Sequence, residues 1–194
     1  MGIDITCNEK SFSCGYGSWN KIRIDTIIAT AEYLKHVKTT NQFEERTYPY
    51  VSLEIINEFM SELISYGKDQ EQEKDQEQTP KQEQAPEQEQ TPKQEQDPEQ
   101  EQNLVGLFLG NCTLELIDVL IFFGVGGLFS LCNKSDCEGY YSVGNAYDIC
   151  ELFHLIKPFL IENSDSPDNY TNVITQIEDV FKESVEISQK ILIC

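Results

Sequence analysis

The chain has 194 residues, of which 34 are acidic and 14 are Lys or Arg, so its formal net charge is −20. A surface this acidic repels nucleic-acid phosphates and anionic lipids, and we expect neither nucleic acid nor a membrane as a partner. The length fits one domain, or one domain with an appendage, and other proteins remain as the expected partners.

Seven cysteines and two histidines occur, and no two cysteines form a CxxC pair. A zinc site is therefore not expected, and no other metal or cofactor site is indicated. The N-terminus lacks the positive and apolar regions of a secretory signal, which argues against a disulfide framework. We expect free thiols in an intracellular protein, in the cytoplasm or the nucleus, of a host cell if the chain is viral.

The first half of the chain predicts a hairpin followed by alternating helix and strand. The stretches "IDITC" and "SFSCG" alternate apolar and polar residues on either side of "NEK", which is typical of two paired strands. Apolar residues spaced three and four apart predict a helix over 22–36. "TYPYV" at 47–51 is expected to form a short edge strand, and a helix is expected from Ser52 to Gly67.

Residues 69–102 form a low-complexity stretch that ends in hexads such as "TPKQEQ" and "APEQEQ". Twelve acidic residues against three lysines give it a formal charge of −9. It contains no aliphatic residue larger than alanine, so it has nothing to bury that would offset the entropy of ordering. We expect a disordered insertion, either a solvated loop without function or an acidic segment that attracts a basic partner.

The second half predicts a series of helices. After the short apolar element "NLVGLFLGN", a helix is expected to start at Asn111 or Thr113, followed by a turn and a short helix in "VGGLFSLCNK". Two longer helices are expected in "AYDICELFHLIKPFLIEN" and over 172–191. Their expected core positions are Ile149, Leu152, Phe153, Ile156 and Leu160, then Val173, Ile177, Val180, Phe181 and Ile187.

The uncharged run from Val119 to Asn133 is too short for a membrane-spanning helix, which needs about 20 residues. Its glycines fit neither a dinucleotide-binding fingerprint nor a phosphate-binding loop. We expect two helices joined by a turn, apolar on all sides, as the most buried element of an α+β domain that is mostly helical.

This pattern resembles the BTB/POZ fold of the Skp family, the adaptors of SCF-type ubiquitin ligases, and of elongin C. The family's buried helix reads T-L-x-x-L-I-x-A-A-x-Y-L-x-I and is followed by x-G-L-L and Cys-Lys. The corresponding residues here are Thr113, Leu114, Leu116, Ile117, Phe122, Val125, Gly127, Leu128, Cys132 and Lys134. The order of elements before the insertion, and an acidic, proline-containing insertion in the place where the Skp branch has one, extend the resemblance over about residues 3–134.

The resemblance implies a BTB/POZ-like core at 1–68 and 103–134, with a small sheet made of the hairpin and a third strand. The insertion at 69–102 and a helical extension at 135–194 complete the chain. The family's Ala-Ala pair is replaced by Val119 and Leu120, and its cullin-contacting Asn-Tyr pair by Ile121 and Phe122. The F-box-binding motif is not recognisable in 140–194.

The implied function is a non-catalytic adaptor that links a cullin-type scaffold to an F-box-type or other receptor. Ile121 and Phe122 are then the candidate partner-binding residues, although Phe122 fits core packing equally well. Two alternatives remain: a BTB-type module that assembles with itself, and a small viral-type helical inhibitor of signalling. No catalytic residues are expected, because neither His36 nor His154 has a nucleophile and an orienting carboxylate legible nearby.

Overall fold

The computed structural model of the chain describes residues 2–40, 61, 105–106, 108–110, 112–134, 139–162 and 167–194. The described part is α+β and mostly helical, as predicted, with one small antiparallel sheet. Its elements are β1 (Gly2–Cys7), β2 (Lys10–Gly15), α1 (Tyr16–Thr40), α4 (Leu114–Phe122), α5 (Gly127–Cys132), β3 (Gly139–Tyr141), α6 (Val143–Glu162), α7 (Pro167–Ile187) and β4 (Ile191–Ile193). The strand expected at 47–51, the helix at 52–67 apart from Ser61, and the insertion lie outside the described residues.

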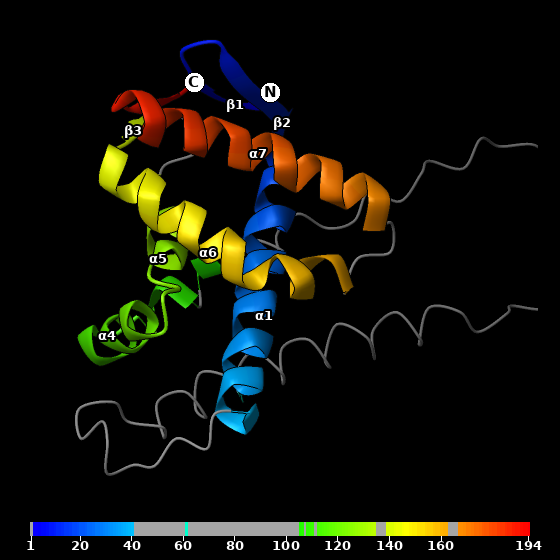
Figure 1. Cartoon of the computed structure of the whole chain (residues 1–194), viewed down its shortest axis with the longest axis vertical. Coiled ribbons are helices and arrows are strands. Elements are labelled where there is room, and N and C mark those ends of the chain that lie inside the picture. The colour runs from blue at the N-terminus through cyan, green and yellow to red at the C-terminus, as the bar shows by residue number, and fades with distance from the viewer. Residues whose placement is uncertain are drawn as a thin grey trace, which may run out of the picture.

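The sheet joins the two ends of the chain in the strand order β2-β1-β4-β3. The predicted hairpin is confirmed: β1 pairs with β2 across a two-residue loop in which Asn8 has a φ of 53°. On its other side β1 pairs with β4, and β4 pairs with β3. Because both neighbours of β1 are thereby taken, the C-terminal strand completes the sheet that the N-terminal hairpin begins (Figure 1).

Alternation along the strands separates a buried face from an exposed one. The inner face carries Ile3, Ile5, Cys7, Phe12, Tyr141, Ile191 and Ile193, all of them buried. Tyr141 packs edge-on against Phe181 of α7, with ring centroids 5.2 Å apart, and Phe12 lies 6.4 Å from Trp19 of α1. The sheet is therefore anchored to both of these helices.

Helix α1 is longer than predicted, because its first turns follow β2 without a break. Trp19 is buried, as are Ile22, Ile27 and Leu34 within the predicted range, so the buried positions of the helix extend toward its N-terminus. Gly15, Gly17 and Ser18 hide this continuation in the sequence, because these residues are typical of turns. The buried hydroxyl of Thr26 donates to the carbonyl of Ile22 at 2.7 Å, which satisfies a polar group within the core.

Helices α6 and α7 run antiparallel and cross α1, and the hairpin lies over α7 (Figure 1). All five core positions predicted in α6 are buried, so that prediction is confirmed. The α6 N-terminus is closed by a reciprocal pair: Ser142 Oγ accepts from the amide of Asn145 at 3.1 Å, and Asn145 Oδ1 accepts from the amide of Ser142 at 3.2 Å. Asn145 Nδ2 also donates to Ser130 Oγ at 3.0 Å, which ties this cap to α5.

The predicted boundaries of the last helix are wrong at both ends. Helix α7 begins at Pro167, where proline is favoured in the first turn, and stops at Ile187, because Ser188 adopts a φ of 55°. Ile187 is consequently exposed rather than part of the core. Residues 191–193 form β4 instead of a final helical turn, so the expected helical extension also supplies two strands, β3 and β4.

Candidate interaction surface

Helix α4 is capped at both ends by hydrogen bonds to its terminal backbone groups. Thr113 is the N-cap, as one of the two predicted starts, and its side chain accepts a hydrogen bond from the amide of Leu116 at 3.2 Å. At the other end Gly124 has a φ of 76°. Its amide donates to the carbonyl of Ile121 at 3.0 Å, and the amide of Val125 donates to the carbonyl of Leu120 at 2.8 Å. These two bonds form a Schellman motif, which turns the chain toward α5.

The predicted helix–turn–helix is confirmed, but the expectation that it is the most buried element of the domain is wrong for its first helix. Helix α5 is buried through Gly127, Leu128, Leu131 and Cys132. Helix α4 buries only one side, formed by Leu116, Val119 and Leu120. Among the described elements α4 packs mainly against α5.

The uncovered side of α4 is apolar. Leu114 is 78% exposed, Ile121 62% and Phe122 41%, which are unusually high fractions for side chains of this size. Leu114, Ile117 and Ile121 are spaced as i, i+3 and i+7, so they follow one stripe along the helix, with Ile117 half-buried at its edge. We call Leu114, Ile117, Ile121 and Phe122 the α4 face.

The structure thus places both sequence-predicted residues, Ile121 and Phe122, at the surface. Phe122 stacks edge-on against Phe123 with centroids 5.1 Å apart, so its ring is partly supported while still exposed. Leu114 was missed as a surface residue, since an apolar residue just after a helix cap is usually assigned to the core. Once Thr113 is known to start the helix, the seven-residue spacing from Leu114 to Ile121 is the signal that places Leu114 on the same side of the helix as Ile121.

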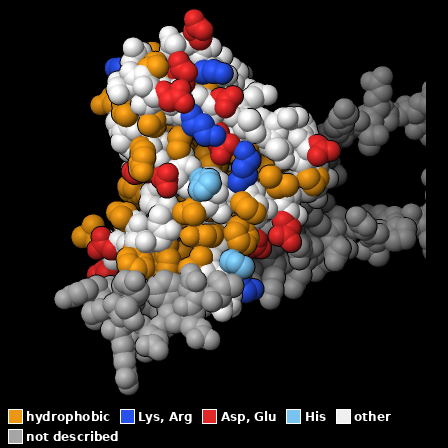
Figure 2. Space-filling view, in the orientation of Figure 1, with side chains coloured by type: hydrophobic (Ala, Val, Ile, Leu, Met, Phe, Trp, Pro, Cys, Tyr) orange, Lys and Arg blue, Asp and Glu red, His pale blue; other side chains and the backbone are white. Residues whose placement is uncertain are grey.

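Acidic side chains lie next to the apolar residues of the α4 face. Glu115 and Asp118 are exposed on the same helix, and α4 and α5 contain no Lys or Arg. Figure 2 shows hydrophobic and acidic side chains next to each other over α4, at the lower left of the view. The face combines apolar area with a negative charge.

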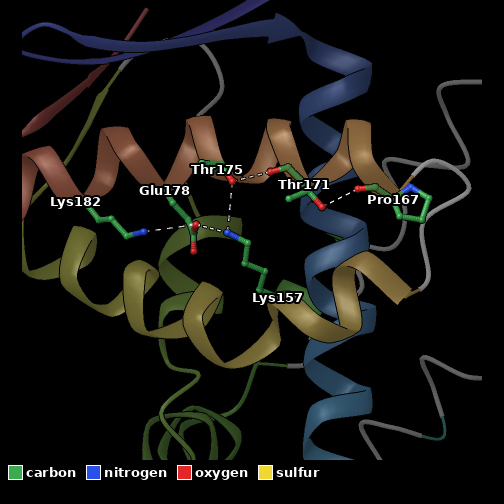
Figure 3. Close-up of polar contacts among 6 residues, drawn as sticks. All are labelled: Lys157, Pro167, Thr171, Thr175, Glu178 and Lys182. Atoms are coloured by element: carbon green, nitrogen blue, oxygen red, sulfur yellow. Dashed lines mark hydrogen bonds and ion pairs between the residues drawn. The ribbon is translucent and has the colours of Figure 1, made fainter.

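A second polar cluster joins α6 to α7. Glu178 is 5% exposed, and its Oε2 lies 2.6 Å from Nζ of Lys157 and 3.6 Å from Nζ of Lys182 (Figure 3). Lys157 Nζ also donates to Thr175 Oγ1 at 3.5 Å. The carboxylate is fully compensated by these groups, so the cluster fastens two helices together rather than presenting a reactive group.

The described histidines and carboxylates do not converge on a metal site. His36 packs against Phe159 with centroids 5.8 Å apart, and His154 is exposed on α6. Within the described ranges, no group of three or more His, Cys, Asp or Glu side chains has the arrangement that a metal ion needs. Tyr170 donates to Asp25 Oδ2 at 2.7 Å, and burial together with this carboxylate raises the pKa of the phenol.

Three of the cysteines, Cys112, Cys132 and Cys150, are held as neutral thiols. Burial raises the pKa of Cys132 to about 12, and that of Cys112 and Cys150 to about 11. Because the thiolate is the form that attacks substrates and binds metals, these groups are poor nucleophiles near neutral pH. All six cysteines of the described residues are free, and Cys194 is exposed.

Among the helices of the described residues, none has the length and apolar character needed to span a bilayer. Comparison with known proteins finds no matching family model, no similar curated protein and no similar solved structure.

Proposed function

We propose that the protein is a non-catalytic, intracellular adaptor for protein–protein interaction, and that the α4 face is one of its docking surfaces. Support comes from one observation: a helix that already buries Leu116, Val119 and Leu120 also exposes Leu114, Ile121 and Phe122. The inner side is sufficient to attach the helix to the core. Apolar area left on the outer side costs free energy in water, roughly 25 cal/mol for each Å², and a partner that covers it recovers this cost.

The kind of adaptor follows from the resemblance of residues 3–134 to the Skp family. In that family the positions matching Ile121 and Phe122 contact a cullin, so a cullin-type scaffold is the proposed partner of the α4 face. The C-terminal helices α6 and α7 are the proposed site for an F-box-type or other receptor. The described hairpin, helix α1 and the helix pair α4–α5 follow one another in the order of the corresponding elements of the resemblance, which supports this proposal.

The test is affinity capture of the full chain from a eukaryotic lysate, followed by mass spectrometry, in three versions: wild type, Ile121→Asp and Leu192→Asp. Leu192 is 45% exposed on the outer face of the sheet, so its variant carries the same change away from the α4 face. We expect a cullin or an F-box protein with the wild type and with Leu192→Asp. We expect the cullin to be lost with Ile121→Asp. Capture of neither protein by the wild type would remove the adaptor function.

A self-assembling module is the second candidate, because exposed apolar area by itself does not distinguish a foreign partner from a second copy of the same chain. Sedimentation velocity separates the two functions. A monomer that binds a foreign scaffold supports the adaptor. A dimer that dissociates when Ile121 is replaced by Asp supports self-assembly.

A further inference from the structure

A carboxylate lies in the middle of the α4 face. On a helix with 3.6 residues per turn, Asp118 is one turn from Leu114 in one direction and one turn from Ile121 and Phe122 in the other. These three apolar side chains and Asp118 are all exposed. A partner that covers the apolar side chains therefore also covers Asp118 or contacts it directly.

The partner has to supply the opposite charge. A carboxylate that loses water without gaining a hydrogen-bonded counter-charge opposes binding. Neither α4 nor α5 contains a Lys or Arg that could supply this charge from within the helix pair. Glu115, at the edge of the face, adds a second negative charge.

A second copy of this chain does not satisfy that requirement. Packing two α4 faces against each other brings Asp118 and Glu115 of one copy next to the same residues of the other, and each copy carries a net charge of −20. Like charges that meet in an interface select against that pairing. Nucleic acids and anionic lipids carry the same unfavourable sign.

We propose that the α4 face binds an amphipathic helix of another protein, which packs Leu or Ile side chains on Leu114, Ile121 and Phe122 and places a Lys or Arg against Asp118. This inference rests on the proposed function and adds the chemistry of the partner. The nine residues of α4 extend over about 13 Å, which matches two to three turns of a second helix. Recognition by apolar contacts around one charge pair is a common form of helix docking.

The test measures fluorescence anisotropy of two synthetic helical peptides with the full chain, at about 0.15 M salt where screening limits non-specific attraction. One peptide has Leu on one face and Lys on the other, and the second has Glu in place of Lys. We expect the Leu/Lys peptide to bind at least about tenfold more tightly than the Leu/Glu peptide. Equal binding of the two peptides would overturn the inference.

Three variants locate the binding site. Asp118→Asn removes the charge without changing the shape, and we expect it to weaken binding of the Leu/Lys peptide by about three- to tenfold. Ile121→Asp is expected to weaken it by about tenfold or more, and the matched control Leu192→Asp by less than about twofold. Circular dichroism verifies that each variant is folded. Equal affinity of wild type, Asp118→Asn and Ile121→Asp would show that the peptide is held elsewhere on the acidic chain.

The two proposals fail in different ways. If no cullin is captured from lysate while peptide binding depends on Asp118 and Ile121, the adaptor function is wrong and the α4 face still binds a basic helix. If a cullin is captured equally by wild type, Asp118→Asn and Ile121→Asp, the protein is an adaptor that binds the cullin elsewhere, and both the assignment of the α4 face as the docking surface and the inference about its partner are wrong.

Discussion

Gly127 lies where α5 packs tightly against the backbone of α6. A Cβ atom at this position would collide with the backbone carbonyl oxygen of Asp148. The obstacle is helix backbone, which cannot rotate away as a side chain does. The glycine is therefore required by the packing of two helices and not by an unusual backbone conformation.

We predict that Gly127→Ala lowers the free energy of unfolding by about 1–3 kcal/mol, because α5 has to move away from α6 to make room for the methyl group. Gly144→Ala is the matched control, since a Cβ there meets only Ser142 Oγ at an ordinary 3.7 Å, and alanine favours the helix. Urea denaturation measures both variants. Equal stability of Gly127→Ala and Gly144→Ala would disagree with the close contact.

The cysteines provide a second prediction at the level of single residues. At pH 8 we expect iodoacetamide to modify the exposed Cys194 first, while Cys132 reacts only after unfolding, because it is 2% exposed and its pKa is about 12. Cys112 and Cys150 are half-buried with a pKa of about 11, so their thiolate fraction, and hence their rate, should rise about tenfold per pH unit from pH 8 to 10. Mass spectrometry of the digested protein assigns each site. Modification of Cys132 as fast as Cys194 would contradict the burial.

At the scale of elements, the contact between α6 and α7 includes an ion pair between Lys157 and the buried Glu178. We predict that Glu178→Gln destabilises the protein by about 1–3 kcal/mol, less than for a fully buried pair, because Lys157 is 28% exposed and can regain water. The double variant Lys157→Met with Glu178→Met should lose less free energy of unfolding than the sum of the losses in the two single variants.

Asp179 is the control for this ion pair, since it lies one residue away and pairs with Lys10 at 4.0 Å with both side chains about half exposed. Asp179→Asn should change the free energy of unfolding by less than about 0.5 kcal/mol, as is usual for surface pairs. Thermal denaturation at fixed pH compares the two. If Asp179→Asn lowered the free energy of unfolding as much as Glu178→Gln does, burial of the ion pair would not explain its contribution to stability.

Elements whose residues contain a local pattern were predictable from sequence. The alternation in β1, the apolar stripe of α6 and the cap at Thr113 each need only neighbouring residues. Strands β3 and β4 were missed because three residues carry no period, and they exist only through pairing with each other and with β1. The exposure of α4 was missed for a related reason: a helix that has large apolar residues on every side does not by itself reveal which of them the core covers.

The same limit applies to the candidate surface. Ile121 and Phe122 were reached through a family resemblance, which fixes positions but not their surroundings. Asp118 was not predicted as part of the candidate surface, because a charged side chain on a helix is usually exposed to solvent without a specific role. Its position between Leu114 and the pair Ile121 and Phe122 becomes informative only when the exposed side of the helix is known.

At the scale of the whole molecule, the described fold is closed by its last strand. The amide and carbonyl of Cys194 bond the carbonyl and amide of Asp4 at 2.9 and 3.1 Å, and Ile5 faces Ile193 across the ladder. The division expected from sequence, with a core up to residue 134 and an extension over 135–194, makes the hairpin independent of the C-terminus. The pairing of β4 with β1 favours a single cooperative unit instead.

Removal of residues 191–194 distinguishes these two arrangements. The truncation takes away the buried side chains of Ile191 and Ile193, each expected to contribute about 1.5–3 kcal/mol, and leaves β1 and β3 without their shared neighbour. We therefore expect it to destabilise the whole protein by several kcal/mol in one urea transition, and to accelerate hydrogen exchange of β1 amides together with those of α7. The matched change Leu192→Ser, on the exposed side of the same strand, should cost less than about 1 kcal/mol. If the truncated chain instead shows two transitions, with β1 and β2 as protected as in the full chain, the hairpin belongs to a core that folds without β4.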